Sequence, residues 1–191
     1  LMPAKFSGGG GHGGGNKGYG PALIDDDTPP PPHAKFSWAK LAVTTLVFVV
    51  IGAASLLALR GNADLYNMGD FFTKAAFLTI GGAYAVLPYV YQGGVEHFGW
   101  LTGPQMMDGL ALGETTPGPL IMIETWVGYL GGVAKGVFSN PIAAGVAGAA
   151  AATFFTFLPF FLVILAGGPL VEATRDEIKF TAPLTGITAA V

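Results

Sequence analysis

Cysteine is absent from the 191 residues of this chain, and charged residues make up only 11% of it. Without cysteine the chain has neither a disulfide framework nor a thiolate metal site. Soluble domains carry about 25% charged residues, so the low share argues against a soluble protein. The Lys and Arg residues form no basic patch that would follow a phosphate backbone, and no nucleic-acid partner is expected.

Apolar residues and glycine are abundant instead. Hydrophobic residues account for 51% of the chain and glycine for 30 of 191 residues, and the mean hydropathy is +0.55. This composition is typical of a membrane protein that crosses the bilayer several times and whose helices pack through glycine. We therefore expect an all-α integral membrane protein, a polytopic helical bundle.

The chain changes character after its first 40 residues. Residues 1–40 contain a glycine tract and a proline run, and we expect them to form a polar linker outside the bilayer. Residues 41–191 form the expected membrane domain. Because its last apolar segment breaks off, we expect the chain to be part of a longer protein. The expected apolar segments are 41–59, 71–91, 119–134, 141–166 and a truncated one from about 182.

The segment 71–91 contains residues that a uniform helix in lipid would avoid. Gly81 and Gly82 lie in its middle, and Lys74 lies near its start. One interpretation is a helix packed closely through its glycines, with Lys74 reaching the interface. The other is a broken or re-entrant helix whose amides at Gly81 and Gly82 face an anion. Segment 141–166 likewise forms either one long helix or two half-helices.

Residues 113–119, Gly-Glu-Thr-Thr-Pro-Gly-Pro, lead directly into segment 119–134. The two prolines and the glycine exclude a regular helix or strand. Irregular backbone beside a membrane segment leaves N–H and C=O groups unpaired, which is tolerated where the backbone lines a site. Pro119 suits a first helical position, and the free amides of the following helix would point back at the stretch. The anion-binding residues expected here are Thr115, Thr116, Pro117, Gly118 and Pro119.

Two carboxylates accompany this stretch. Glu114 lies within it, and Glu124 lies inside the following apolar segment. A carboxylate in a membrane helix is costly and is a functional candidate by default. For Glu124 the alternatives are an interior hydrogen bond or a place near the interface. Because burial favours the protonated form of a carboxyl group, Glu114 and Glu124 are both candidates to carry a coupled proton.

These breaks predict an anion site. Secondary transporters bind anions near the midplane of the membrane through half-helix N-termini directed inward. Gly81, Gly82 and the stretch 113–119 are expected to present such amides to an oxyanion, with Lys74 as a supplementary cation. Two other classes stay open: an assembly subunit that packs through its glycines and transports nothing, and an intramembrane enzyme. The histidines are scattered and no nucleophile has a base beside it, so we expect no enzymatic activity, no metal and no cofactor.

The sequence resembles the second half of a long-chain chromate ion transporter. A segment at 20–29 (GPALIDDDTP) also resembles the linker between the halves in one branch of that family. The runs that carry the main resemblance are 72–77 (FTKAAF), 81–90 (GGAYAVLPYV), 96–101 (EHFGWL), 105–122 (QMMDGLALGETTPGPLIM) and 127–131 (VGYLG).

The resemblance implies both a fold and a function. Long-chain members have two related halves of opposite membrane orientation, so the partner of this half would be the N-terminal half or a second chain. It implies secondary efflux of chromate, or of a related oxyanion such as sulfate, by a multi-pass protein of the inner (plasma) membrane. The chain departs from the family pattern at Gly113, where Ala is more usual. It departs again at Thr125, where Gln is common, which weakens the case for a polar role there.

Overall fold

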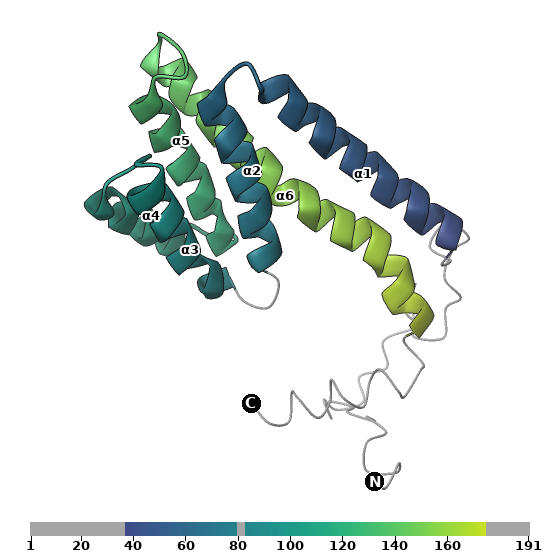
Figure 1. Ribbon diagram of the computed structural model, residues 1–191. Helices are drawn as coiled ribbons and strands as arrows, with labels where there is room; N and C mark the ends of the chain where they lie inside the picture. The colour runs from purple at the N-terminus through teal and green to yellow at the C-terminus, as the bar shows by residue number, and fades with distance from the viewer. Residues whose placement is uncertain (1–36, 80–82, 175–191) are drawn as a thin grey trace, which may run out of the picture. The chain divides into compact units, whose positions relative to one another are not determined.

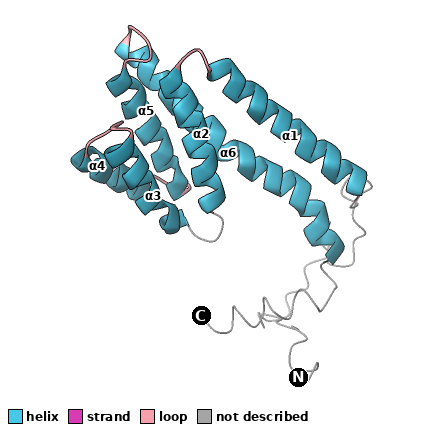
Figure 2. Ribbon diagram, in the orientation of Figure 1, coloured by secondary structure: helices cyan, strands magenta, loops and turns pink. Residues whose placement is uncertain are grey.

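The computed structural model describes residues 37–79 and 83–174, which are almost entirely helical and contain no strand (Figures 1 and 2). This agrees with the expected all-α class. The linker within 1–36, the glycines Gly81 and Gly82, and the apolar segment from about 182 lie outside the described residues. The helices are α1 (Trp38–Leu59), α2 (Ala63–Leu78), η2 (Ala83–Val86), α3 (Leu87–Tyr91), η3 (Gln92–His97), α4 (Gly103–Thr115), η4 (Leu120–Met122), α5 (Ile123–Lys135) and α6 (Pro141–Thr174).

The chain divides into two compact units. Residues 42–166 form one unit, which contains most of the described helical structure. The other unit comprises residues 1–41 and 167–191, of which the structure describes the first turn of α1 and the last turns of α6. The core and the cavities described below belong to the unit 42–166.

The apolar segment 71–91 is divided between separate helices. α2 ends at Leu78, and Pro88 lies in the first turn of α3. Proline is favourable there, because the first amides of a helix have no partner within it. η3, a π-helix, then continues from α3. The described parts of the segment therefore lie in separate helices.

Aromatic side chains fill the core between α2 and the turn after η3. Trp100 is 1% exposed, and its ring stacks on that of Phe98 with the centroids 4.4 Å apart. Phe71 meets the ring of Trp100 edge-on at 5.3 Å. On the other side Trp100 packs on Gly131, where an added Cβ would lie 2.9 Å from its side chain. This contact attaches the aromatic core to α5.

α5 begins directly after η4 and ends at Lys135, and it is capped by Gly136, whose φ of 60° is the left-handed conformation that glycine adopts readily. Its glycine face contacts α6 through the backbone. A Cβ on Gly132 would lie 2.1 Å from the carbonyl oxygen of Ala144, and one on Gly128 would also meet α6. The expectation that glycines bring the helices into close contact is confirmed.

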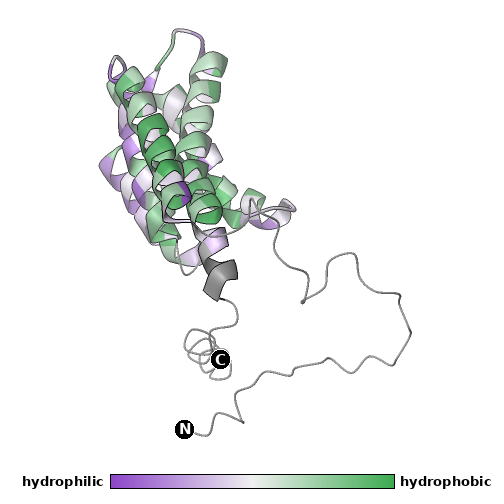
Figure 3. Ribbon diagram, turned by 90° about the vertical axis from the view of Figure 1, so that its right-hand side faces the viewer, coloured by the Kyte–Doolittle hydropathy of each residue, from purple (hydrophilic) through white to green (hydrophobic). Residues whose placement is uncertain are grey.

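α6 is one continuous helix rather than two half-helices, although Pro159 lies within it. Among the described residues, two helices are long and apolar enough to cross a membrane, at Trp38–Leu59 and Pro141–Pro169. Each exceeds the roughly 20 residues that span a bilayer. α1 has no buried residue, and hydrophobic residues extend along most of the helical surface (Figure 3). Lipid is the solvent that suits such a surface.

Candidate functional site

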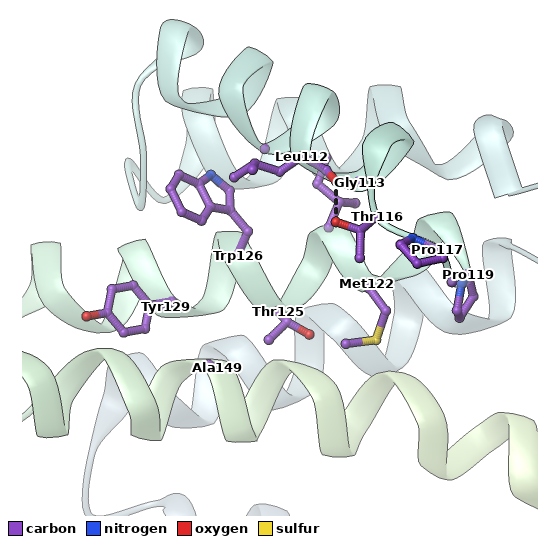
Figure 4. Close-up of a pocket in the computed structure, with 13 residues that line it drawn as sticks. Leu112, Gly113, Thr116, Pro117, Pro119, Met122, Thr125, Trp126, Tyr129 and Ala149 are labelled. Carbon is purple, nitrogen blue, oxygen red and sulfur yellow. Dashed lines mark hydrogen bonds between the residues drawn. The ribbon is translucent and has the colours of Figure 1, made fainter.

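A cavity of about 680 Å³ lies between the end of α4, the start of α5 and one turn of α6 (Figure 4). α4 contributes Leu112, α5 contributes Thr125 and Trp126, and α6 contributes Ala149. The stretch 113–119 forms one side of the cavity. Its lining residues are Gly113, Thr116, Pro117, Gly118 and Pro119. The structure therefore brings the expected residues from 116 to 119 together at a single cavity, and Thr115 lies beside it without lining it.

Proline chemistry shapes this side of the cavity. Thr116, which follows the last residue of α4, is extended with φ −87° and ψ 126°, because a residue that precedes a proline avoids the helical region. Pro119 is also extended, with φ −70° and ψ 130°, and caps η4. The expectation that Pro119 takes a first helical position is wrong by one residue, since the helical turn begins at Leu120. The backbone between Thr116 and Pro119 is irregular, as expected.

The threonine hydroxyls of the stretch donate into α4 rather than into the cavity. Thr115 Oγ1 donates to the carbonyl of Ala111 at 2.9 Å, and Thr116 Oγ1 donates to that of Leu112 at 2.6 Å (Figure 4). A hydroxyl carries one hydrogen. These bonds therefore satisfy carbonyls at the negative end of α4, and Thr116 presents only oxygen lone pairs to the cavity.

Backbone amides are the donors that remain at this end. Pro117 and Pro119 have no N–H group, and the amide of Met122 donates to the carbonyl of Pro119 at 3.0 Å. Leu120 and Ile121 form the first turn, and the first amides of a helix have no carbonyl one turn earlier to accept them. Neither residue lines the cavity, and their N–H groups and the positive end of the α5 dipole are the electropositive features beside it.

Thr125 has a polar role that the sequence argued against. Thr153 Oγ1 donates to the carbonyl of Ala149 at 2.8 Å, which uses its one hydrogen. Thr125 must then be the donor in its 2.7 Å hydrogen bond with Thr153. The bond joins α5 to α6 at the cavity wall. The spacing of Thr125 and Tyr129, one helical turn apart, was the signal that both face the same side.

Trp126 forms the opposite wall and was not expected from the sequence. Its Nε1 donates to the carbonyl of Gln105 at 3.0 Å. A Cβ added to Gly109 would lie 2.4 Å from the Trp126 ring. The indole therefore packs against the backbone of α4 and fixes the distance between α4 and α5.

Glu124 does not line the cavity, although its neighbours in the sequence, Ile123 and Thr125, both do. It is 1% exposed. Thr156 of α6 donates a hydrogen bond to Glu124 Oε2, while Glu124 Oε1 has no partner in the described chain. The interior hydrogen bond considered for Glu124 is confirmed. Glu114, in contrast, is exposed on the last turn of α4.

Lys74 lies at a different cavity, of about 350 Å³, which Tyr89, Gln92 and His97 also line. Its Nζ is 2.5 Å from Asp70 Oδ2, and the two side chains are 62% and 45% exposed. Exposed ion pairs of this kind contribute at most about 1 kcal/mol. The structure does not bring Lys74 to the stretch 113–119. Within residues 37–79 and 83–174, no group of three or more His, Asp or Glu is placed to hold a metal ion.

The exposed apolar helices, together with irregular backbone that lines a cavity between helices, are typical of a helical membrane protein. The family profile described as Chromate transporter matches residues 66–191. The chain belongs to the chromate transporter family, which confirms the resemblance noted in the sequence.

Three similar proteins are also described as chromate transport proteins. A chromate transport protein from Pseudomonas aeruginosa is 35% identical over 154 residues, which cover 81% of this chain and 32% of that protein. One from Cupriavidus metallidurans is 32% identical over 126 residues, covering 66% and 28%. A probable chromate transport protein from Synechococcus elongatus is 30% identical over 120 residues, covering 63% and 28%. The chain thus spans 28% to 32% of the length of these relatives. No solved structure matches it.

Proposed function

We propose that this chain forms part of a secondary transporter that exports chromate, or a related oxyanion such as sulfate, across the cytoplasmic membrane. Membership of the family and the names of its relatives support an ion substrate. The observation that carries the proposal is the cavity at the helix break, where irregular backbone from Thr116 to Pro119 forms a wall. Such breaks are where membrane transporters hold anions.

The proposed anion site uses backbone amides. The N–H groups of Leu120 and Ile121 and the dipole of α5 attract negative charge without a fixed cation. Thr115 and Thr116 assist by donating to carbonyls of α4, since this weakens the negative end of that helix beside the anion. A site made of dipoles holds a multivalent oxyanion weakly enough to release it, as transport requires.

Other residues have accessory roles in this proposal. Gly81 and Gly82, whose amides the sequence assigns to the anion, lie outside the described residues. Lys74 serves as an accessory cation at its own cavity. Glu114 and Glu124 are the candidates to carry a coupled proton. The chain works with a related N-terminal half or with a second chain, in the inner membrane.

Gly118 provides the test. A Cβ at this position meets nothing within 4 Å, and Gly118 is not among the glycines with positive φ. Gly118→Ala therefore fits, whereas Gly118→Leu places a longer side chain at a residue that lines the cavity. In proteoliposomes with the full-length protein, Gly118→Leu is expected to lower chromate flux about tenfold, equivalent to about 1.4 kcal/mol, while Gly118→Ala keeps wild-type flux.

Both variants must insert into the membrane as the wild type does, which is checked by recovery of folded protein. Equal flux from Gly118→Leu and wild type would remove the cavity from the transport path. Absence of chromate and sulfate flux from the wild type itself would favour the assembly-subunit interpretation.

A further inference from the structure

The hydroxyl of Thr156 is directed differently from those of Thr153 on its own helix and Thr73 on α2. On α6, Thr153 donates to the carbonyl of Ala149, one turn earlier in its own helix. On α2, Thr73 donates in the same way to Gly69. This is the usual local bond of a helical threonine. Thr156 instead donates across the interface to Glu124 of α5.

Glu124 has no charged partner that would account for its burial. α6 carries no ionisable residue between 141 and 169. On α2, Asp70 and Lys74 pair with each other. No hydrogen bond or ion pair joins Glu124 to a charged group of the described chain. The remaining ionisable groups on the helices packed against α5, and on α5 itself, are Asp64 and Tyr66 on α2, Glu96 and His97 on η3, Asp108 and Glu114 on α4, Tyr129 and Lys135 on α5, and Glu172 near the end of α6.

We propose that Thr156 is a positioning residue that makes Glu124 a reversible proton site between α5 and α6. A hydroxyl can donate to a carboxylate or accept from a carboxylic acid. In the ionised form Thr156 donates to Glu124 Oε2. When Glu124 takes a proton from the aqueous phase, its new O–H donates to Thr156 Oγ1. The threonine hydrogen then turns to the carbonyl of Ala152, one turn earlier in α6.

The proton site is adjacent to the cavity through the same pair of helices. Thr125 follows Glu124 and bonds to Thr153, one turn from Thr156. Thr125 also lines the cavity. Protonation at Glu124 therefore changes one of two neighbouring links between α5 and α6, and the other link is part of the cavity wall. This inference rests on the proposed transport function, because it assigns that cavity its coupled proton.

The test measures protonation of Glu124 directly. Infrared spectroscopy of the purified full-length protein in lipid follows the C=O band of the protonated carboxyl group as the pH is varied. The band that disappears in Glu124→Gln belongs to Glu124. Thr156→Val removes the donor that favours the carboxylate, so the midpoint of this band is expected about one pH unit higher.

Two controls separate positioning from packing. Thr156→Ser retains the hydroxyl and is expected to titrate as the wild type does. Thr73→Val removes a hydroxyl that bonds within its own helix, and it should leave the midpoint unchanged. An unchanged midpoint in Thr156→Val, or an infrared spectrum unaltered by Glu124→Gln, would overturn the inference. A wild type without flux would overturn the transport function, while the titration would still decide the role of Thr156.

Discussion

Gly128 and Gly148 bring the backbones of α5 and α6 into contact, since a Cβ on Gly148 would lie 2.1 Å from the carbonyl oxygen of Gly128. A side chain larger than hydrogen cannot fit at this point unless the helices separate. The same close approach places Glu124 within hydrogen-bond reach of Thr156. The glycine contact therefore sets the distance between α5 and α6, the two helices that hold the cavity wall and the buried carboxyl group.

Gly148→Ala is expected to lower the stability of the protein, because its methyl group meets backbone that cannot turn away. Overpacking of this kind costs roughly 1–3 kcal/mol. Gly167→Ala on the same helix is the matched control, since nothing lies within 4 Å of a Cβ there. Thermal unfolding followed by circular dichroism in detergent should show a lower midpoint for Gly148→Ala alone. Equal midpoints for the two variants would contradict the close contact.

Asp70 and Lys74 are expected to affect anion affinity in opposite directions. Asp70 neutralises Lys74 across a 2.5 Å ion pair. Asp70→Asn would leave the cation unpaired and lower the half-saturation concentration for chromate, whereas Lys74→Ala would raise it. Both effects should weaken in high salt, because exposed charges are screened. Initial rates of flux at graded chromate concentrations, at low and at high salt, give the half-saturation concentration of each variant. Lys74 has no part in anion capture if neither variant changes the half-saturation concentration.

Glu114 and Glu124 are distinguished by their neutral variants. Glu124→Gln removes a buried ionisable group, so flux is expected to lose its dependence on pH. Glu114→Gln removes an exposed carboxylate beside the stretch 113–119 and is expected to reduce flux with membrane insertion intact. Flux measured between pH 5 and pH 8, a range chosen to include the titration of a buried carboxyl group, compares the two. Wild-type flux at every pH in either variant would exclude that residue from coupling.

The sequence predicted the irregular backbone between Thr116 and Pro119 because proline acts locally. Pro117 and Pro119 cannot continue a helix, so the irregular stretch followed from the residue types alone. Pro159 did not break α6. In a helix that packs against others, neighbouring groups can satisfy the carbonyl that a proline leaves free. The residue types alone therefore predicted the irregular stretch at Pro117 and Pro119, but they left open whether Pro159 divides α6.

The sequence could not predict the links between α5 and α6. Thr125 and Thr153 are 28 residues apart, and Glu124 and Thr156 are 32 apart. Which side chains meet at such separations depends on how each helix is rotated, and glycine spacing alone does not fix that rotation. The Asp70–Lys74 pair is different. Its four-residue spacing was visible in the sequence and predicts an ion pair on a helix.

Flux of chromate in proteoliposomes that contain only the purified full-length protein tests the central proposal most directly. Chromate is expected to cross the membrane without ATP, to be driven by an imposed pH gradient, and to be inhibited by sulfate. Gly118→Leu should lower this flux about tenfold and Gly118→Ala should retain it. Flux that needs ATP, or wild-type vesicles no more permeable to chromate and sulfate than empty ones, would contradict the proposed function.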